Sequence, residues 1–122
     1  MMNQKGFTLI EIMAVMVMIG VLASVAVKKQ LQTQDNARLL AIDVAVAELR
    51  SRETLTWTRE MFGGSYKNDV DMFTSLDTNV GSKYTWTVVA NPSGGTIRFE
   101  TVSRALTRTP SSREGPGSWN LM

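Results

Sequence analysis

The sequence of 122 residues includes no histidine and no cysteine, so candidate functional side chains are first sought among its carboxylates and arginines. Without cysteine the chain forms no disulfide and no thiolate metal site. Without histidine it lacks the commonest general base and metal ligand. Both absences argue against a hydrolase triad and against a zinc enzyme. The carboxylate in the most unusual setting is Glu11, the one charged residue in the apolar run from Phe7 to Val27.

Glu11 lies about one helical turn inside this apolar run. A charged residue costs several kcal/mol at the centre of a membrane-spanning helix and less near its end, so such a residue is by default a functional candidate. The alternative is an interfacial glutamate whose carboxylate reaches back to the headgroups. Position alone leaves both interpretations open.

Three aspartates, Asp69, Asp71 and Asp77, could supply oxygen ligands to calcium. Their spacing does not match an EF-hand loop, and no glutamate completes one. We therefore expect solvated loop charges, with no metal site and no cofactor.

Four arginines with Trp119 nearby could form a strip that binds nucleic acid. From Leu31 onward, however, the sequence has ten basic and ten acidic residues, whose charges cancel. The net charge of +2 therefore comes from the lysines around the apolar run. Spaced arginines are a weak signal, and we do not expect nucleic acid as a partner. The four are Arg98, Arg104, Arg108 and Arg113.

The element that must position Glu11 is the apolar run itself. Its 21 residues would form a helix about 31 Å long, which matches a bilayer hydrocarbon core of about 30 Å. Apolar residues fall on every side, unlike those of an amphipathic surface helix, and the rest of the chain is too small to wrap it. The run therefore predicts a membrane-spanning helix.

Composition alone leaves two other interpretations of this helix open. A cleaved secretory signal would use Lys5 in its basic region and Ser24-Val25-Ala26 as its cleavage site, although a carboxylate in the apolar region argues against it. A plain single-pass anchor is the other. Lys5 and the α-amino group nearly balance Lys28 and Lys29 on the far side, so charge does not fix the orientation.

The helix is expected to continue beyond the apolar run. Residues 31–61 contain no glycine or proline, and Gly63-Gly64 is a plausible stop. Glu48 and Arg52 are spaced as a favourable i,i+4 pair. This part of the helix has two apolar stripes, and each needs a partner. Either one stripe packs on the chain's own sheet and the other on neighbouring subunits, or both belong to one internal core. The first contains Leu39, Ile42, Val46 and Leu49, and the second Leu40, Val44 and Ala47.

Residues 83–90 and 96–102 alternate apolar with polar side chains and flank the turn sequence Asn91-Pro92-Ser93-Gly94-Gly95, which predicts a β-hairpin. A hairpin alone is marginal in water, so we expect it to pack on the helix. Its core candidates are Tyr84, Trp86, Ile97 and Phe99.

The two remaining segments are polar. Residues 64–82 predict a connector that is attached to the core by Val70, Met72, Phe73 and Leu76. Residues 103–122 are rich in Ser, Thr, Arg, Pro and Gly, which predicts a disordered or loosely docked tail.

Residues 1–11, MMNQKGFTLIE, resemble the start of a type IV prepilin, in the superfamily of type IV pilins and type II secretion pseudopilins. The matching features, within residues 1–30, are a short leader with Lys5, then Gly6, Phe7 and Glu11, and an unbroken apolar stretch. The resemblance implies that a prepilin peptidase cuts between Gly6 and Phe7 and that the new amine of Phe7 is N-methylated. A residue without a side chain lets the protease approach the backbone closely.

The resemblance also implies an orientation, partners and a role for Glu11. The leader stays in the cytoplasm and Lys28 onward faces the periplasm. Glu11 becomes the assembly residue, paired with the N-terminal amine of a neighbouring subunit or of its own chain, because a buried charge is tolerable when paired. The implied partners are other pilin or pseudopilin subunits, the prepilin peptidase, the inner-membrane assembly platform and, before assembly, the lipid bilayer.

The sequence departs from many family members in having no proline near the end of the apolar stretch. Gly20 and Ser24 are its interior helix weakeners, so the helix either stays continuous or softens at Gly20. Together they form a pair of small residues that suits close helix packing. Lys28 and Lys29 are expected at the membrane interface as anchors, or they bind anionic headgroups or acidic groups of partner subunits in the filament.

We therefore predict an α+β fold: a long N-terminal α-helix, half transmembrane, with a small antiparallel β-sheet packed on its C-terminal half. The expected function is structural rather than enzymatic, as a subunit of a type IV pilus or pilus-like filament, with a minor pilin or a pseudopilin favoured. The alternatives are a type II secretion piston subunit and a membrane-anchored binding module that never polymerises.

The expected location is the bacterial inner membrane, then a periplasmic or cell-surface filament. The expected segments are a leader (1–6), a filament-core helix (7–29), a periplasmic helix half (30–62), a globular region (63–102) and a polar tail (103–122).

Overall fold

The structure is a computed structural model that describes residue 6 and residues 8–122. Its longest element is the helix α1 (Leu9–Phe62), which has 54 residues. The chain divides into two compact units, Met1–Asn36 and Ala37–Met122, and α1 contributes to both. The remaining elements, all in the second unit, are α2 (Asp69–Thr74), β1 (Tyr84–Asn91), β2 (Gly94–Phe99), β3 (Val102–Thr109) and β4 (Ser118–Leu121).

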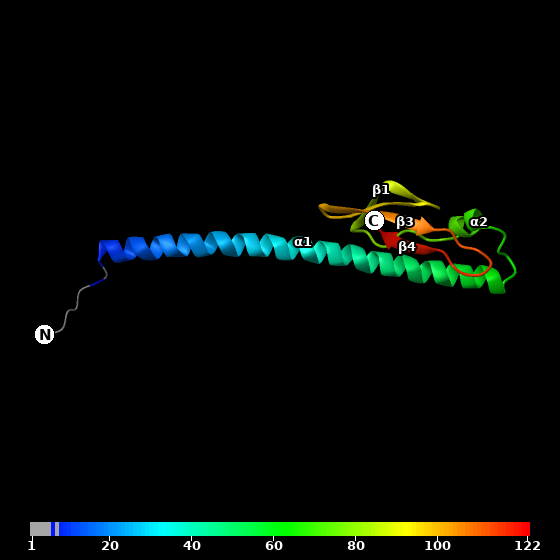
Figure 1. Cartoon of the computed structure of the whole chain (residues 1–122), viewed down its shortest axis with the longest axis horizontal. Helices are drawn as coiled ribbons and strands as arrows, with labels where there is room; N and C mark the ends of the chain where they lie inside the picture. Colours follow the sequence, from blue (N-terminus) through cyan, green and yellow to red (C-terminus); the bar gives the residue numbers. More distant parts are fainter. Residues whose placement is uncertain (1–5, 7) are drawn as a thin grey trace. The chain divides into compact units, whose positions relative to one another are not determined.

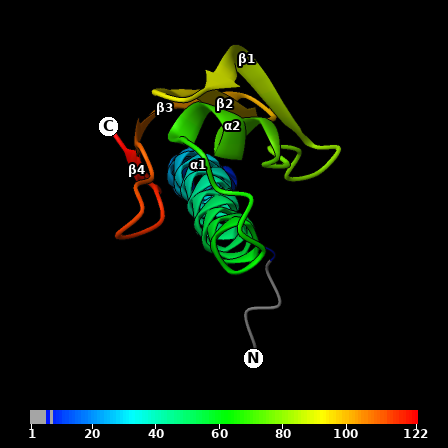
Figure 2. The same ribbon diagram turned by 90° about the vertical axis from the view of Figure 1, so that its right-hand side faces the viewer.

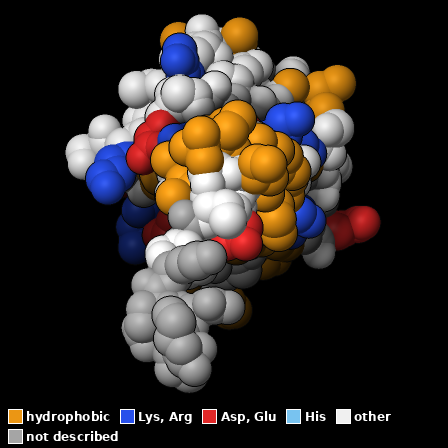
Figure 3. Space-filling model, turned by 90° about the vertical axis from the view of Figure 1, so that its left-hand side faces the viewer, with side chains coloured by type: hydrophobic (Ala, Val, Ile, Leu, Met, Phe, Trp, Pro, Cys, Tyr) orange, Lys and Arg blue, Asp and Glu red, His pale blue; other side chains and the backbone are white. Residues whose placement is uncertain are grey.

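In the first unit, α1 runs through Gly20 without a break, so the helix is continuous rather than softened there. By length and composition it is the one helix of the described residues that could cross a membrane. Its apolar side chains are exposed on all sides of this stretch, from 41% for Ile12 to 78% for Ile10. Figure 3 shows hydrophobic side chains crowding the N-terminal end of the helix. A surface of this kind needs lipid or other protein around it.

The second unit is a four-stranded antiparallel sheet in the order β1-β2-β3-β4, packed with α2 along one side of the C-terminal half of α1 (Figures 1 and 2). The predicted α+β class and the predicted hairpin are therefore confirmed. In the β1–β2 hairpin, Gly94 has φ +135, and a Cβ there would collide with the carbonyl oxygen of Leu106. Only glycine suits this position, since it combines positive φ with close backbone approach.

The core of this unit joins one face of α1 to the inner face of the sheet. The first predicted stripe is the buried one, with Ile42 and Leu49 at 0% exposure. The second stripe is exposed, with Leu40 at 62% and Val44 at 66%, so the two stripes do not share one internal core. The buried apolar cluster contains Ile42, Ala45, Val46, Leu49, Leu76, Ile97, Leu106 and Trp119.

The prediction of a disordered tail is wrong. Residues 102–109 form β3, which pairs with β2 from Val102 to Thr107, and residues 118–121 form β4 on the edge of the sheet. Trp119, fully buried, is a central core residue. The sequence also predicted one strand over residues 96–102. In the structure this segment belongs to two strands, because β2 ends at Phe99 and Glu100 turns the chain with φ 53.

The connector also holds more structure than expected. Asn68 caps α2 by accepting a hydrogen bond from the backbone amide of Asp71 (2.9 Å). Met72 and Leu76 are buried as predicted and Phe73 packs against the core, but Val70 is 59% exposed and does not attach the connector.

Candidate assembly site and buried ion cluster

The candidate assembly residue, Glu11, lies in the first turn of α1. Thr8 precedes the helix, and its hydroxyl oxygen accepts a hydrogen bond from the backbone amide of Glu11 (3.2 Å). This is the cap geometry expected when Ser or Thr stands three residues before Glu. The cap begins the helix at Leu9 and places the Glu11 carboxylate near the positive end of the helix dipole.

Glu11 is exposed among exposed apolar side chains. It borders a shallow groove of about 320 Å³ whose other lining residues are Ile12, Val15, Met16 and Ile19. Within the described residues no ion pair involves Glu11. If this surface is buried against lipid or protein, the carboxylate needs a cation from elsewhere, because an unpaired buried charge is costly.

The predicted processing residues are only partly described. Gly6 is exposed, and a Cβ built on it would meet no atom within 4 Å. Packing within the described chain therefore does not require glycine there. Phe7 and the leader residue Lys5 lie outside the described residues.

The two small residues and the two lysines all lie on the exposed surface of α1. Gly20 has open space where a side chain would stand, and the Ser24 hydroxyl is directed back to the helix, where it donates to the carbonyl of Val21 (2.7 Å). One turn apart, they leave a low strip on which another helix could pack closely. Lys28 and Lys29 are exposed just after the apolar run.

The second unit contains an ion cluster around Arg108 on β3. The Arg108 guanidinium donates to both oxygens of Glu53 on α1 (2.5 and 3.2 Å) and to both oxygens of Asp69 on α2 (2.7 and 2.9 Å). Trp119 on β4 adds an indole N–H bond to Glu53 (3.2 Å). The side chains of Glu53 and Arg108 are fully buried, and that of Asp69 is 14% exposed.

Ionisation of the cluster follows from these contacts. Burial acts to raise the pKa of Asp69, but hydrogen bonds from Arg108 and Ser111 outweigh it and lower the pKa from 3.8 to about 2. Burial acts to lower the pKa of Arg108, and its bonds to Asp69 and Glu53 outweigh that effect and raise it. Both groups stay charged at neutral pH, so the cluster joins α1, α2 and the sheet electrostatically.

This cluster corrects one expectation from the sequence, because Asp69 is an ion-pair partner rather than a solvated loop charge. Arg108 lies in the interior, so it is not part of an exposed arginine strip, an alternative that the sequence did not favour. Glu53 was not singled out, although it follows Ile42, Val46 and Leu49 at helical spacing on the buried face. A carboxylate that continues an apolar stripe is the signal that could have found it. No group of metal-ligating side chains is found among the described residues.

Comparisons with known proteins find a family motif at the N-terminus and several relatives. The family model of the prokaryotic N-terminal methylation motif matches residues 1–27. The type IV narrow pilus major component PilA5 of Thermus thermophilus is 42% identical over 50 residues, 41% of this chain and 43% of that protein. Two fimbrial proteins of Pseudomonas aeruginosa are each 34% identical over 94 residues, 77% of this chain and 57% of theirs. No solved structure matches.

The chain therefore carries the prokaryotic N-terminal methylation motif, and the resemblance to type IV pilins predicted from residues 1–11 is confirmed. More particularly, it is similar to pilus and fimbrial proteins, and it spans about half the length of these relatives.

Proposed function

We propose that this chain is a structural subunit of a type IV pilus or pilus-like filament. The proposal rests on two features that occur in the same segment. Residues 1–27 match the methylation motif, and the helix there has apolar side chains exposed on all sides, interrupted by one carboxylate. The named relatives are components of such fibres, which supports the same role here.

In the proposed sequence of events, the chain is first stored in the inner membrane with its leader in the cytoplasm. Lys28 and Lys29 follow the apolar run and would sit among the headgroups on the periplasmic side. The prepilin peptidase cuts between Gly6 and Phe7, and the new amine of Phe7 is methylated. Processing thus creates a positive charge four residues before Glu11.

In the proposed filament, the apolar part of α1 leaves lipid and packs against the same part of other subunits. Glu11 then needs a cation, and the processed amine of a neighbouring subunit supplies one. An unpaired carboxylate in such a core would cost several kcal/mol, so the pair favours one axial register. Gly20 and Ser24 would let two helices approach closely.

Two observations bear on which filament this is. The relatives' names support a pilus rather than a type II secretion piston. The unbroken helix without proline supports a minor or divergent subunit.

The test is incorporation of Glu11→Ala into sheared filaments, measured against the amount of the variant in membranes. We expect normal membrane insertion and at least a tenfold loss from the filament fraction. Glu114→Ala is the matched control, because it removes an exposed carboxylate outside α1, and it should incorporate normally. Normal incorporation of Glu11→Ala would contradict the assembly role of this residue.

A further inference from the structure

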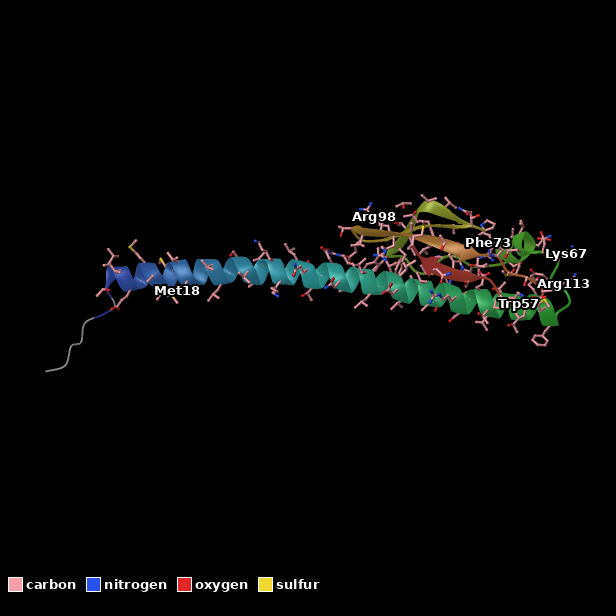
Figure 4. The ribbon with its side chains drawn as sticks, viewed as in Figure 1. Met18, Trp57, Lys67, Phe73, Arg98 and Arg113 are labelled. Carbon is pink, nitrogen blue, oxygen red and sulfur yellow. The ribbon has the colours of Figure 1, made fainter. Side chains whose placement is uncertain are left out.

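A small cavity lies in the second unit, where α1 ends. It has a volume of about 210 Å³ and is lined by Met61, Gly64, Tyr66 and Arg113. One wall comes from the end of α1 and the loop that follows it, and the other from the loop between β3 and β4. Figure 4 labels Arg113, Lys67 and Trp57 at this end of the helix. Neither the ion cluster nor the assembly residue lies in this cavity.

Hydrogen bonds hold both walls in place. The Tyr66 hydroxyl bonds to the Ser111 hydroxyl (3.2 Å), and the Trp57 indole donates to the carbonyl of Ser112 (2.7 Å). The loop that carries Arg113 is closed by a bond from the Ser112 amide to the carbonyl of Gly115 (2.9 Å). Because its walls are fixed, the cavity would lose little conformational entropy when a ligand binds.

Arg113 supplies the charge of this cavity. Its guanidinium has no hydrogen bond or ion pair among the described residues, unlike those of Arg50, Arg52 and Arg108. A free guanidinium fork suits a planar carboxylate, which it can bind with two parallel hydrogen bonds.

The other lining groups suit a flat, partly apolar body. The Tyr66 ring offers an aromatic wall, and Met61 adds a thioether. Gly64 has φ +71, and a Cβ there would meet no atom within 4 Å, so a ligand can approach the backbone closely. Cavities for drug-sized ligands are about 300–1,000 Å³, so this one holds a single small ring.

We propose that this cavity binds an acidic sugar residue of the uronic-acid type, as part of a polysaccharide. The sugar carboxylate pairs with Arg113, and a C–H face of the ring packs on Tyr66. Arg113 is exposed, so binding of one residue is weak, and many subunits on a repeating polymer would strengthen it. Binding of one sugar residue by one chain does not depend on the proposed assembly, whereas the strengthening by many subunits rests on the proposed function.

The test is a titration of the full chain, kept unpolymerised in a polyoxyethylene detergent that contains no sugar. Glucuronate is the probe, and the NMR shifts of the Gly64 amide and the Arg113 Nε–H group are followed. We expect a dissociation constant at least tenfold lower for glucuronate than for glucose, for inorganic phosphate or for an N-acetylglutamate amide. Equal or tighter binding of phosphate would show a general anion site, and equal or tighter binding of the glutamate amide a site for protein carboxylates. Either result would overturn the sugar assignment.

Variants separate the two contacts. Arg113→Gln should weaken glucuronate binding at least tenfold, whereas Arg98→Gln, an exposed arginine on β2, should leave it within twofold. Tyr66→Phe keeps the ring, and the bonds of Ser112 to Trp57 and Gly115 still hold the loop, so binding should be retained, whereas Tyr66→Leu should lose it. An unchanged amide spectrum outside the cavity shows that each variant is folded. Unchanged glucuronate binding by a folded Arg113→Gln variant would overturn the sugar proposal. Filament assembly by the same variant would show that the proposed function does not depend on sugar binding.

Discussion

At the scale of single residues, Arg108 on β3 connects the sheet to both α1 and α2. Its guanidinium lies between two carboxylates and also faces the ring of Phe73 at 5.0 Å. Every buried side-chain nitrogen and oxygen in the described residues has a hydrogen-bond partner. Such a cluster is costly to break from one side, because the groups left behind remain buried and charged.

Replacing Arg108 should therefore be strongly destabilising. For Arg108→Met we expect a loss of about 3–5 kcal/mol in the free energy of unfolding, since Glu53 and Asp69 lose their cation. Arg98→Met, at an exposed position, should change it by less than about 0.5 kcal/mol. Denaturant unfolding of the full chain in detergent, followed by near-UV circular dichroism, measures both. Equal effects of the two substitutions would show that the cluster does not stabilise the fold.

Asp69 predicts how stability depends on pH. Its pKa is about 2 in the folded chain against a usual 3.8, so the folded state holds the carboxylate more strongly in its charged form. The resulting stabilisation, on the order of 2 kcal/mol, is fully present above about pH 4. It is lost as the pH falls through about 2.

Asp69→Asn tests this prediction. The free energy of unfolding should fall between about pH 4 and pH 2 in the wild type, and this part of the fall should be absent in the variant. Asp77→Asn, which lies in a loop and is largely exposed, is the control and should keep the wild-type profile. A variant at Asp69 whose profile matches the wild type would contradict the ion pair.

The sequence reveals only part of this residue-scale chemistry. Glu11 could be recognised because the residues around it are continuous in the chain and uniformly apolar. The ion cluster could not, since Arg108 is 39 residues from Asp69 and 55 from Glu53. Pairing at such separations depends on how the strands and α2 pack, which local patterns do not specify.

At the scale of elements, the two apolar stripes of α1 differ in whether they are covered. The buried stripe packs on the sheet, and the exposed stripe of Leu40, Val44 and Ala47 has no partner within the described residues of the second unit. In the proposed filament, neighbouring subunits would cover the exposed stripe.

Substitutions on the two stripes should separate folding from any role in assembly. Leu49→Ala should destabilise the second unit by about 2–5 kcal/mol, because it leaves a cavity in a packed core. Leu40→Ala should change the free energy of unfolding by less than about 0.5 kcal/mol. Thermal unfolding of both variants measures the difference, and a large loss with Leu40→Ala would mean that this stripe is also part of the folded core.

The β-elements show where local pattern fails. The β1–β2 hairpin was predictable because its turn sequence and alternation are adjacent in the chain. In β3 the inward positions include Arg104 and Arg108, so the strand has too little apolar alternation to be recognised. Four-residue β4 is stabilised by Trp119, whose burial depends on the core formed by α1 and the other strands.

At the scale of the whole molecule, the two units differ in what their surfaces require. The second unit has its own core, and each of its buried side-chain nitrogen and oxygen atoms has a hydrogen-bond partner. The first is a helix with its apolar side chains exposed, so it needs lipid or other subunits around it. A chain of this kind suits a protein that is stored in a membrane and then assembled through its first helix.

The measurement that tests the central claim most directly is the intact mass and N-terminal sequence of the chain purified from its native membrane. We expect a chain that begins at Phe7 and carries one methyl group on its α-amine, and we expect Gly6→Val to block this processing. A chain that retains Met1–Gly6 where the peptidase is active would contradict the proposal and favour a plain anchored module. A chain that begins at Val27 would contradict it as well, because the apolar run would then be a secretory signal.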